Sequence, residues 1–512
     1  MTEVPDILTV YATANPDKPA LICGDDVLTY RAYDESSNRA ARALVDLGVA
    51  PGDRVAVMSY NSISGSVVSA GLRKARAVSV PVNFRLRGPE LAYVVQDSGA
   101  RVVCAGPEFV EHVEAARPQI EAGPALVAIG EGELPAGWVR LTDAMAAATS
   151  GALPEDAESG AGEAMIYTSG TTGHPKGAYR PQGIDPASVV QVIQMFGLRG
   201  DDVHLMGGPG YHSAVGAFAG MTILCGATLV IVPRFDPEQA LALTERHRVT
   251  TTFMAPTLLQ RIMDLPDEVR ARHDVSSMRA IILGAAPCPY SLKERATAYF
   301  GEVLWEFYGA TETGFNLVLR PEDQLRKPGS AGSAPVGQEI LLLDDDGNPV
   351  PDGQPGEVWV RNGWLASYYN KPEATRRAMR DGFFSVGDIA YRDAEGYYYI
   401  CDRKIDMIIS GGVNIYPAEI EACLHAHPAV QDAAVVGVPD DQWGESVKAV
   451  VALQPGAGAT EQELIDWCRG RMADYKRPRS VDFVPELPRD QAGKLLKRRI
   501  RAPYWASAGR SI

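Results

Sequence analysis

The stretch TSGTTGHPKG, residues 168–177, combines small hydroxyl residues, glycines and a lysine. A loop that wraps a polyphosphate needs unobstructed backbone N–H groups, hydroxyl donors and a cation, and this stretch has all three. It is not a Walker A loop, because two residues separate the last preceding glycine from Lys176. Residues 164–167 before it are typical of a strand, which favours a phosphate loop over the alternative, a flexible linker.

A second stretch, EFYGATETG at residues 306–314, joins an aromatic ring to polar groups. Tyr308 can lie flat against a purine. Thr311 and Glu312 then offer a hydroxyl to a phosphate and a carboxylate to a metal ion. The plainer interpretation of Glu312 is a carboxylate at the start of a helix.

These two stretches are part of a larger set of motifs. The chain resembles the acyl-adenylate-forming (ANL) superfamily, which includes acyl-CoA and aryl-CoA synthetases, adenylation domains of peptide synthetases and firefly luciferase. The resemblance covers nearly the whole chain, and the common order of its motifs argues against coincidence. The motifs are YTSGTTGHPKG (167–177), GPGYH (208–212), EFYGATETG (306–314), SVGD (385–388), DRKIDMIISGGVNIYPAEIE (402–421) and Gly493-Lys494.

The resemblance implies an ATP site in which the glycine-rich loop holds the β- and γ-phosphates. It assigns Tyr308 to adenine stacking and Thr311 to the α-phosphate. Glu312 would hold Mg²⁺, which favours carboxylate and phosphate oxygens, with Thr168 as a second metal contact. The residues implied to bind ATP or AMP are Thr168, Ser169, Gly170, Thr171, Thr172, Gly173, Lys176, Ala285, Tyr308, Gly309, Thr311, Asp388 and Arg403.

The resemblance also implies two residues that contact the ribose of ATP. Asp388 would accept hydrogen bonds from both ribose hydroxyls, which suits an acceptor-only carboxylate, and Arg403 would contact the ribose or a phosphate. Without the other motifs, Asp388 is interpreted as a turn aspartate beside glycine and Arg403 as one half of a surface ion pair.

The C-terminal motifs imply a catalytic lysine that acts together with Thr311 and Glu312. Lys494 would bridge the substrate carboxylate and the α-phosphate, since a point cation helps two anions to approach. The alternative is a solvated basic helix. The family carries Asp or Lys at its hinge, where this chain has Ile405, so the pivot stays open between Lys404 and Asp406.

The remaining motifs concern coenzyme A and the acid. After rotation of the C-terminal domain, Ser410, Gly411 and Gly412 would line the tunnel for the pantetheine arm, although glycines equally suit a tight turn. His212, Gly284 and Ala285 would contact the acid, whereas a lone histidine is more often structural. A fatty or related hydrophobic acid is expected; medium or long fatty acids, sterol side chains and aryl acids all stay open.

Apolar segments alternate with helical ones along most of the chain. Residues 28–59 predict a strand, a helix and a buried strand, and similar units follow, as layered parallel or mixed α/β sheets require. From about residue 337 to 402 the sequence predicts a small β-barrel-like unit. We therefore expect an α/β fold with an adenylate-forming domain over 1–402 and a smaller, mobile α+β lid domain over 403–512, which carries Lys494.

Composition and charge limit the function classes. The 512 residues suffice for about three structural units, and a formal net charge of −15 opposes binding to nucleic acid or an anionic membrane. The seven cysteines form no CxxC pair, and no signal segment or membrane-length apolar run stands out, so we expect a cytoplasmic protein without membrane insertion. A homodimer is one open possibility for the oligomeric state.

The expected reaction is a two-step ligation with ATP, Mg²⁺ and coenzyme A. A carboxylic acid would form an acyl-adenylate and pyrophosphate, and the thiol of coenzyme A would then displace AMP. Three rival functions stay open: acyl transfer to a carrier protein in trans, luciferase-like oxidation of the adenylate, and non-catalytic nucleotide binding. Retention of Glu312, Asp388 and Lys494 disfavours the last.

Overall fold

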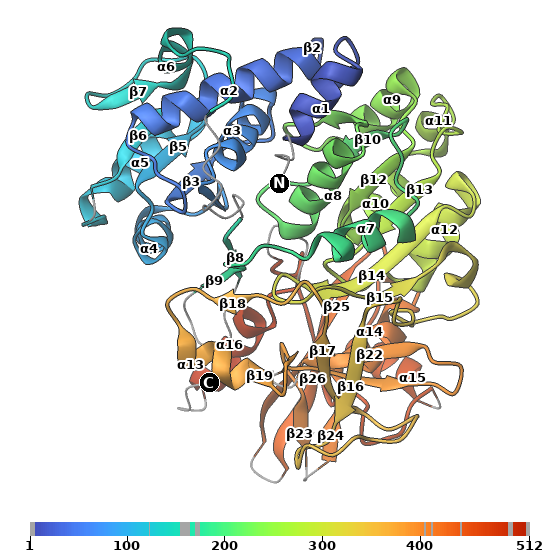
Figure 1. Ribbon diagram of the computed structural model, residues 1–512. Coiled ribbons are helices and arrows are strands. Elements are labelled where there is room, and N and C mark those ends of the chain that lie inside the picture. Colours follow the sequence, from blue (N-terminus) through green and yellow to red (C-terminus); the bar gives the residue numbers. More distant parts are fainter. Residues whose placement is uncertain are drawn as a thin grey trace.

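The computed structural model describes residues 6–121, 123–153, 164–168, 175–403, 406–410, 413–440, 443–469, 471–489 and 495–507. Two α/β units lie side by side in the upper half of Figure 1, and the β-rich and C-terminal units lie below them. Among the described helices, none combines the length and the apolar character that a membrane span needs.

The first α/β unit contains five parallel strands in the order β4-β3-β5-β6-β7. In β5, Val103 and Ala105 pack with α4 and α5, whereas Val102 and Cys104 pack with α2 and α3. A strand buried on both faces reads as a continuous apolar run. The elements are α2 (Tyr30–Asp46), β3 (Arg54–Met58), α3 (Ile63–Lys74), β4 (Val78–Pro81), α4 (Gly88–Ser98), β5 (Val102–Ala105), α5 (Val110–Ala116), β6 (Ala125–Ala128), β7 (Trp138–Arg140) and α6 (Leu141–Ala147).

The second α/β unit has an eight-stranded mixed sheet, β15-β14-β13-β12-β10-β11-β1-β2, in which β2 and β15 are antiparallel to their neighbours. In β13, Ala280 and Ile282 face α8, whereas Ile281 and Leu283 face α10 and α12. The elements are α1 (Ile7–Ala14), β1 (Pro19–Cys23), β2 (Asp26–Thr29), α7 (Pro186–Met195), β10 (Val203–Met206), α8 (Ser213–Leu224), β11 (Thr228–Ile231), α9 (Pro237–His247), β12 (Thr251–Met254), α10 (Pro256–Met263), α11 (Asp267–Arg270), β13 (Ala280–Leu283), α12 (Tyr290–Phe300), β14 (Leu304–Ala310) and β15 (Gly314–Leu319).

Two antiparallel sheets follow these units. A three-stranded sheet joins the hairpin of β8 (Ile166–Thr168) and β9 (Lys176–Tyr179) to β18 (Ser367–Tyr368). The β-rich unit is a six-stranded sheet with α13 (Pro372–Ala378) nearby in sequence. Its strands are β16 (Glu339–Leu343), β17 (Gly356–Arg361), β19 (Met379–Arg380), β20 (Phe383–Phe384), β21 (Asp388–Arg392) and β22 (Tyr398–Arg403).

The C-terminal unit packs helices on a five-stranded sheet, β24-β23-β26-β25 with β27 beside β26. Only the β26–β27 pair is parallel among these pairings of described strands. The elements are β23 (Ile408–Ser410), β24 (Val413–Ile415), α14 (Pro417–His425), β25 (Val430–Asp440), β26 (Gly444–Leu453), α15 (Glu461–Cys468), β27 (Ser480–Phe483) and α16 (Lys497–Ser507).

Most of the predicted local structure is confirmed. The strand–helix–strand unit over 28–59 is β2, α2 and β3, and the predicted capping box forms with both hydrogen bonds between Thr460 and Glu463. One boundary is wrong: the helix expected to end near Met472 ends at Cys468, because Arg469 adopts extended backbone angles. The domain boundary near residue 402 stays a prediction.

Candidate active site

A cavity of about 1590 Å³ is bounded by both α/β units, the β8–β9 hairpin and the β-rich unit. Such a volume exceeds the roughly 300–1,000 Å³ typical of a pocket for one small ligand. It therefore has room for more than a nucleotide. The predicted site residues that line it are Thr168, Lys176, His212, Ala285, Gly309, Thr311, Glu312 and Asp388.

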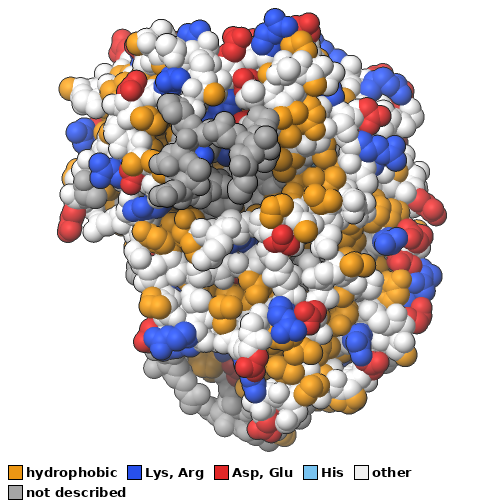
Figure 2. Space-filling view, in the orientation of Figure 1, with side chains coloured by type: hydrophobic (Ala, Val, Ile, Leu, Met, Phe, Trp, Pro, Cys, Tyr) orange, Lys and Arg blue, Asp and Glu red, His pale blue; other side chains and the backbone are white. Residues whose placement is uncertain are grey.

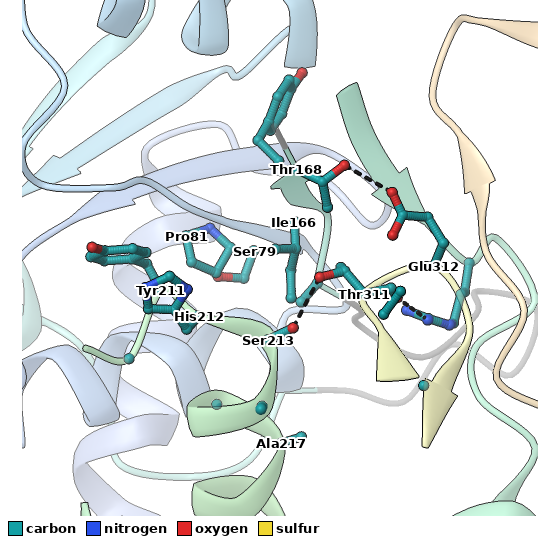
Figure 3. A pocket seen from close by; sticks show the side chains of 18 of the residues that line it. Ser79, Pro81, Ile166, Thr168, Tyr211, His212, Ser213, Ala217, Thr311 and Glu312 are labelled. Atoms are coloured by element: carbon teal, nitrogen blue, oxygen red, sulfur yellow. Dashed lines mark hydrogen bonds between the residues drawn. The ribbon is translucent and has the colours of Figure 1, made fainter. Parts of the chain in front are cut away.

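Glu312 is a carboxylate of the cavity wall that two hydroxyl groups hold in place. It follows β14 in a turn, is only 7% exposed, and its Oε1 accepts hydrogen bonds from the Thr168 hydroxyl (2.9 Å) and the Tyr368 hydroxyl (3.2 Å). Figure 3 shows Thr168 and Glu312 facing each other. The ammonium of Lys176 lies 4.9 Å from the centre of the Tyr368 ring. Hard oxygen ligands and a cation thus stand together, as the motifs predict for phosphate and metal.

Thr311 connects this group to α8. Its hydroxyl lies 3.0 Å from that of Ser213 at the start of the helix, and its carbonyl accepts a hydrogen bond from buried Arg180 (2.6 Å). Arg180 also donates to the carbonyl of Trp364 (2.5 Å). The guanidinium therefore fixes the backbone of the β14–β15 turn, and Thr311 and Ser213 present two hydroxyls to the cavity (Figure 3).

Asp388 opens β21 and is 8% exposed. Its Oδ2 accepts a hydrogen bond of 2.6 Å from the hydroxyl of Tyr308, and its backbone pairs with that of Arg403 on β22. Tyr308 does not line the cavity, although its ring hydroxyl reaches the lining carboxylate. The preceding turn is held by Ser385, which donates to Glu357 (2.7 Å) and accepts from the backbone N–H of Gly387 (3.0 Å).

The turn after β13 brings Ala285, but not Gly284, to the cavity wall. A side chain at Gly284 would come within 2.8 Å of the Phe307 ring, so glycine is required there by packing. Ala285 has a φ of +68°, a left-handed conformation that is uncommon for residues other than glycine. The thiol of nearby Cys288 is not a candidate nucleophile, because burial raises its pKa.

His212 precedes α8 and lines the cavity beside Tyr211, with the two ring centres 4.6 Å apart. Both residues lie near Ser79, Pro81 and Ile166 in Figure 3. An aromatic wall is therefore present where the motif places the acid, and the contact itself stays a prediction.

Asp97 at the end of α4 holds both flanks of the glycine-rich loop. It accepts hydrogen bonds from Tyr167 (2.8 Å), directly before the loop, and from Lys371 (2.7 Å). Tyr93, which also contacts Asp97 (3.2 Å), donates to the carbonyl of Pro175 (3.1 Å) near the end of the loop. Burial and the bond to Asp97 raise the pKa of Tyr167, and the Asp97 carboxylate raises that of Lys371. Around neutral pH the tyrosine stays a donor and the lysine stays charged.

Ser410, predicted to contact coenzyme A, ends β23 and does not line the cavity. Other predicted residues cannot be compared with the structure. For Arg403, only the backbone is described. The residues outside the described part of the chain are Ser169, Gly170, Thr171, Thr172, Gly173, Lys404, Ile405, Gly411, Gly412 and Lys494.

Sequence reasoning missed four contacts of the site: Asp97, Arg180, Ser213 and Tyr368. Asp97, Arg180 and Tyr368 each stand alone in their segments, without a second functional residue at a fixed spacing. A signal was present only for Ser213, which directly follows the GPGYH motif.

Comparison with known proteins places this architecture in a family. The sequence pattern described as AMP-binding enzyme matches residues 8–370, and the AMP-binding enzyme C-terminal domain matches residues 419–494. The chain belongs to the AMP-binding enzyme family. This assignment confirms the resemblance to the acyl-adenylate-forming superfamily and the α/β fold with a smaller C-terminal domain.

Relatives within the AMP-binding enzyme family include CoA ligases. The feruloyl-CoA synthase of an Amycolatopsis species is 38% identical over 498 residues, which cover 96% of this chain and 97% of that protein. The long-chain-fatty-acid–CoA ligase FadD13 of Mycobacterium tuberculosis is 36% identical over 503 residues, 97% of each chain. The crystal structure of ATP-bound MatB from Rhodopseudomonas palustris is 30% identical, covers 97% of this chain and 99% of that one, and has a TM-score of 0.86.

This AMP-binding enzyme is an ATP-dependent acyl-CoA synthetase, an acid–thiol ligase that uses ATP and coenzyme A. The two CoA ligases are named for different acids, one aromatic and one aliphatic. Family membership therefore fixes the reaction class and leaves the acid undetermined.

Proposed function

We propose that this synthetase activates its acid at Thr311 and Ser213 and then passes it to coenzyme A through a second conformation. The observation that carries the proposal is the convergence of Thr168, Thr311 and Glu312 on one cavity, with Asp388 on its wall. In the first step, a carboxylate oxygen attacks the α-phosphorus of ATP and pyrophosphate leaves. In the second, the sulfur of coenzyme A attacks the acyl carbon and AMP leaves.

The chain's own groups would bring two anions together. The Thr311 and Ser213 hydroxyls, 3.0 Å apart, can donate to the α-phosphate and to the attacking carboxylate. Lys176 would face the outer phosphates, and Lys494 would bridge the reacting groups. Positioning and charge neutralisation supply most of the catalysis in such phosphoryl chemistry.

Glu312 and Thr168 fit a magnesium ion. Their oxygens are 2.9 Å apart, and Mg²⁺ favours one or two carboxylates together with phosphate oxygens and water. Within the described residues, no cluster of three or more His, Cys, Asp or Glu could hold a metal by itself, so ATP would have to supply ligands. When bound, the ion would neutralise charge on the phosphates.

Asp388 would hold the ribose, and Tyr308 would lie against the adenine next to Ala285. The hydrogen bond between Tyr308 and Asp388 supports this assignment, because it fixes the carboxylate beside the ring. Arg403 lies opposite Asp388 in the β21–β22 register, which agrees with a ribose or phosphate contact. Ser410, Gly411 and Gly412 would contact the pantetheine arm after the C-terminal unit rotates.

The test is pyrophosphate release from Mg·ATP with a panel of fatty and aromatic acids, with and without coenzyme A. The wild type should release pyrophosphate only with an acid and form thioester only with coenzyme A. Lys494→Ala should abolish release, whereas the matched control Arg498→Ala, an exposed cation on α16, should retain it. Full release by Lys494→Ala would contradict the assignment of the lysine, and release without thioester would contradict coenzyme A as the acceptor.

A further inference from the structure

The cavity continues well beyond the groups proposed to bind ATP. From Ser213 it runs along α8 to Leu224 and along α3 from Ser62 to Arg73, so that both helices form its walls. Figure 1 shows α3 and α8 facing each other from the two α/β units. We call this part, between residues 62–73 and 213–224, the α3–α8 groove.

After Ser213, the wall formed by α8 is apolar, with small residues up to Gly220 and larger side chains at Ile223 and Leu224. Val215 and Phe218 point into the core, whereas the opposite face, with Ala217 and Gly220, lines the groove. A Cβ atom added at Gly220 would meet no other atom within 4 Å, so packing does not require glycine there. Glycine inside a helix costs about 1 kcal/mol relative to alanine. At position 220, the absence of a side chain leaves space open in the groove.

The wall formed by α3 contains serines whose hydroxyl hydrogens are bonded within the helix. The hydroxyl of Ser66 donates to the carbonyl of Ser62 (3.0 Å), and that of Ser69 donates to Gly65 (3.0 Å). A serine that bonds the carbonyl four residues earlier has used its hydrogen within its own helix. These hydroxyls therefore offer no free donor to a polar substituent of a ligand.

Hydrophobic side chains continue at the mouth of the groove. Figure 2 shows hydrophobic side chains gathered over α8. Leu224, the last residue of α8, lines the cavity and is 42% exposed. Exposed apolar surface that is continuous with a reaction site is typical of a ligand-binding groove.

The far end of the groove contains a charged side chain that already forms an ion pair. Arg73 lines the cavity, and its guanidinium contacts both carboxylate oxygens of Asp6, the residue that caps α1. Nearby, the hydroxyl of Tyr33 donates to the carbonyl of Ser66 (3.1 Å). A second carboxylate, as in a dicarboxylic acid, would have to displace Asp6. The pair instead marks where an apolar tail stops.

We propose that the acid is a linear aliphatic monocarboxylic acid of about 10–14 carbons, whose tail fills the α3–α8 groove and ends at the Arg73–Asp6 pair. This rests on the proposed function, since the carboxylate must react beside Ser213. Helices α3 and α8 have 12 residues each, which corresponds to a length of about 18 Å. A zigzag carbon chain with bonds of about 1.5 Å advances about 1.25 Å per carbon, so about 14 carbons span the groove.

The first test uses saturated acids from four to eighteen carbons, with ferulic acid as the aromatic competitor. We expect kcat/KM to rise about fourfold per added carbon, which corresponds to about 0.8 kcal/mol per buried methylene, and to level off near 12–14 carbons. Preference for ferulic acid, or no dependence on chain length, would overturn the proposal. Absence of pyrophosphate release with every acid would instead contradict the proposed function.

The second test blocks the groove from either wall. Gly220→Leu should lower kcat/KM for dodecanoic acid about 30-fold, because overpacking typically costs 1–3 kcal/mol, and change that for butanoic acid less than twofold. Ser69→Leu on α3 should act in the same way. Because it changes the other wall, it tests the groove independently if Gly220→Leu does not fold. Ser64→Leu, exposed on α3 and outside the groove, is the matched control.

Arg73→Met tests the end of the groove. Without the ion pair, the optimum should move to acids of 16 or more carbons, while Ser64→Leu keeps the wild-type optimum. If Gly220→Leu and Ser69→Leu lower the rates of short and long acids equally, or if Arg73→Met leaves the optimum unchanged, the tail does not lie in this groove.

Discussion

At the nucleotide end of the cavity, each functional side chain is held by a partner. Glu312 accepts from Thr168 and Tyr368, and Asp388 accepts from Tyr308. In the α3–α8 groove, serine hydroxyls bond their own helix, and glycine and alanine leave open space. Chemistry on phosphorus needs fixed charges, whereas recognition of an alkyl tail needs shape. Substitutions at the first end should therefore affect all acids alike, and those in the groove should separate acids by length.

The largest effect should follow from Glu312→Gln. The amide keeps the size of the side chain but removes the charge that would hold the metal, so pyrophosphate release should fall about 10³-fold for butanoic and dodecanoic acid alike. Steady-state release at saturating Mg·ATP measures this. Glu322→Gln, at an exposed glutamate, is the control. A loss confined to long acids would break the proposed separation of the two ends.

Asp97→Asn should raise the KM for ATP about 50-fold without changing the KM for the acid. The amide leaves the ammonium of Lys371 without its partly buried carboxylate partner and weakens the anchors on both sides of the loop. The double variant Asp97→Asn/Lys371→Met should recover part of the loss. Asp201→Asn, at an exposed position, controls for net charge. An equal rise in both KM values would show that Asp97 supports the cavity as a whole.

His204 on β10 packs against α8: its ring stacks on that of Phe218, with the two ring centres 6.2 Å apart. Burial lowers its pKa from 6.5 to about 4. The unfolded chain therefore binds the proton more tightly, and stability is lost as pH falls through this interval. The free energy of unfolding should decrease by about 2 kcal/mol from pH 7.5 to 5.0 through this residue.

Urea unfolding of the wild type and His204→Gln at both pH values isolates that contribution. The pH-dependent part should disappear in the variant, whatever its absolute stability. If both proteins lose the same free energy on acidification, His204 is not the group responsible, and the support of α8 does not depend on its neutral form.

Tyr308→Phe should have the smallest effect. It removes one hydrogen bond to the Asp388 carboxylate and keeps the ring that we propose to lie against adenine, so the KM for ATP should rise about fivefold, equivalent to about 1 kcal/mol. Tyr290→Phe, at an exposed tyrosine, is the control. A change in chain-length preference would contradict the placement of Tyr308 at the nucleotide end.

The sequence predicted the nucleotide end far better than the groove. Thr168, Thr311, Glu312 and Asp388 belong to compact motifs, and the fold brings all four to one cavity. Their roles stay predictions. The partners of these residues were missed because a single Asp97 or Tyr368 carries no spacing pattern; only the packed sheets reveal which side chain faces it.

The α3–α8 groove could not be predicted from the sequence, for a different reason. The small residues of α8 at positions 217 and 220 are equally compatible with tight packing against another helix. Whether such a face touches another helix or borders a space depends on α3, which comes from the other α/β unit. Shape of this kind is a property of the assembled layers.

The anchoring of the loop flanks has a consequence for nucleotide affinity. Thr168 pairs with Lys176 across the β8–β9 hairpin, and Asp97 and Tyr93 hold the residues beside it. The entropy of bringing the two ends of this loop together is therefore lost once, when the protein folds. ATP would not have to supply that part of the ordering free energy on each turnover, which leaves more of its intrinsic binding energy for the transition state.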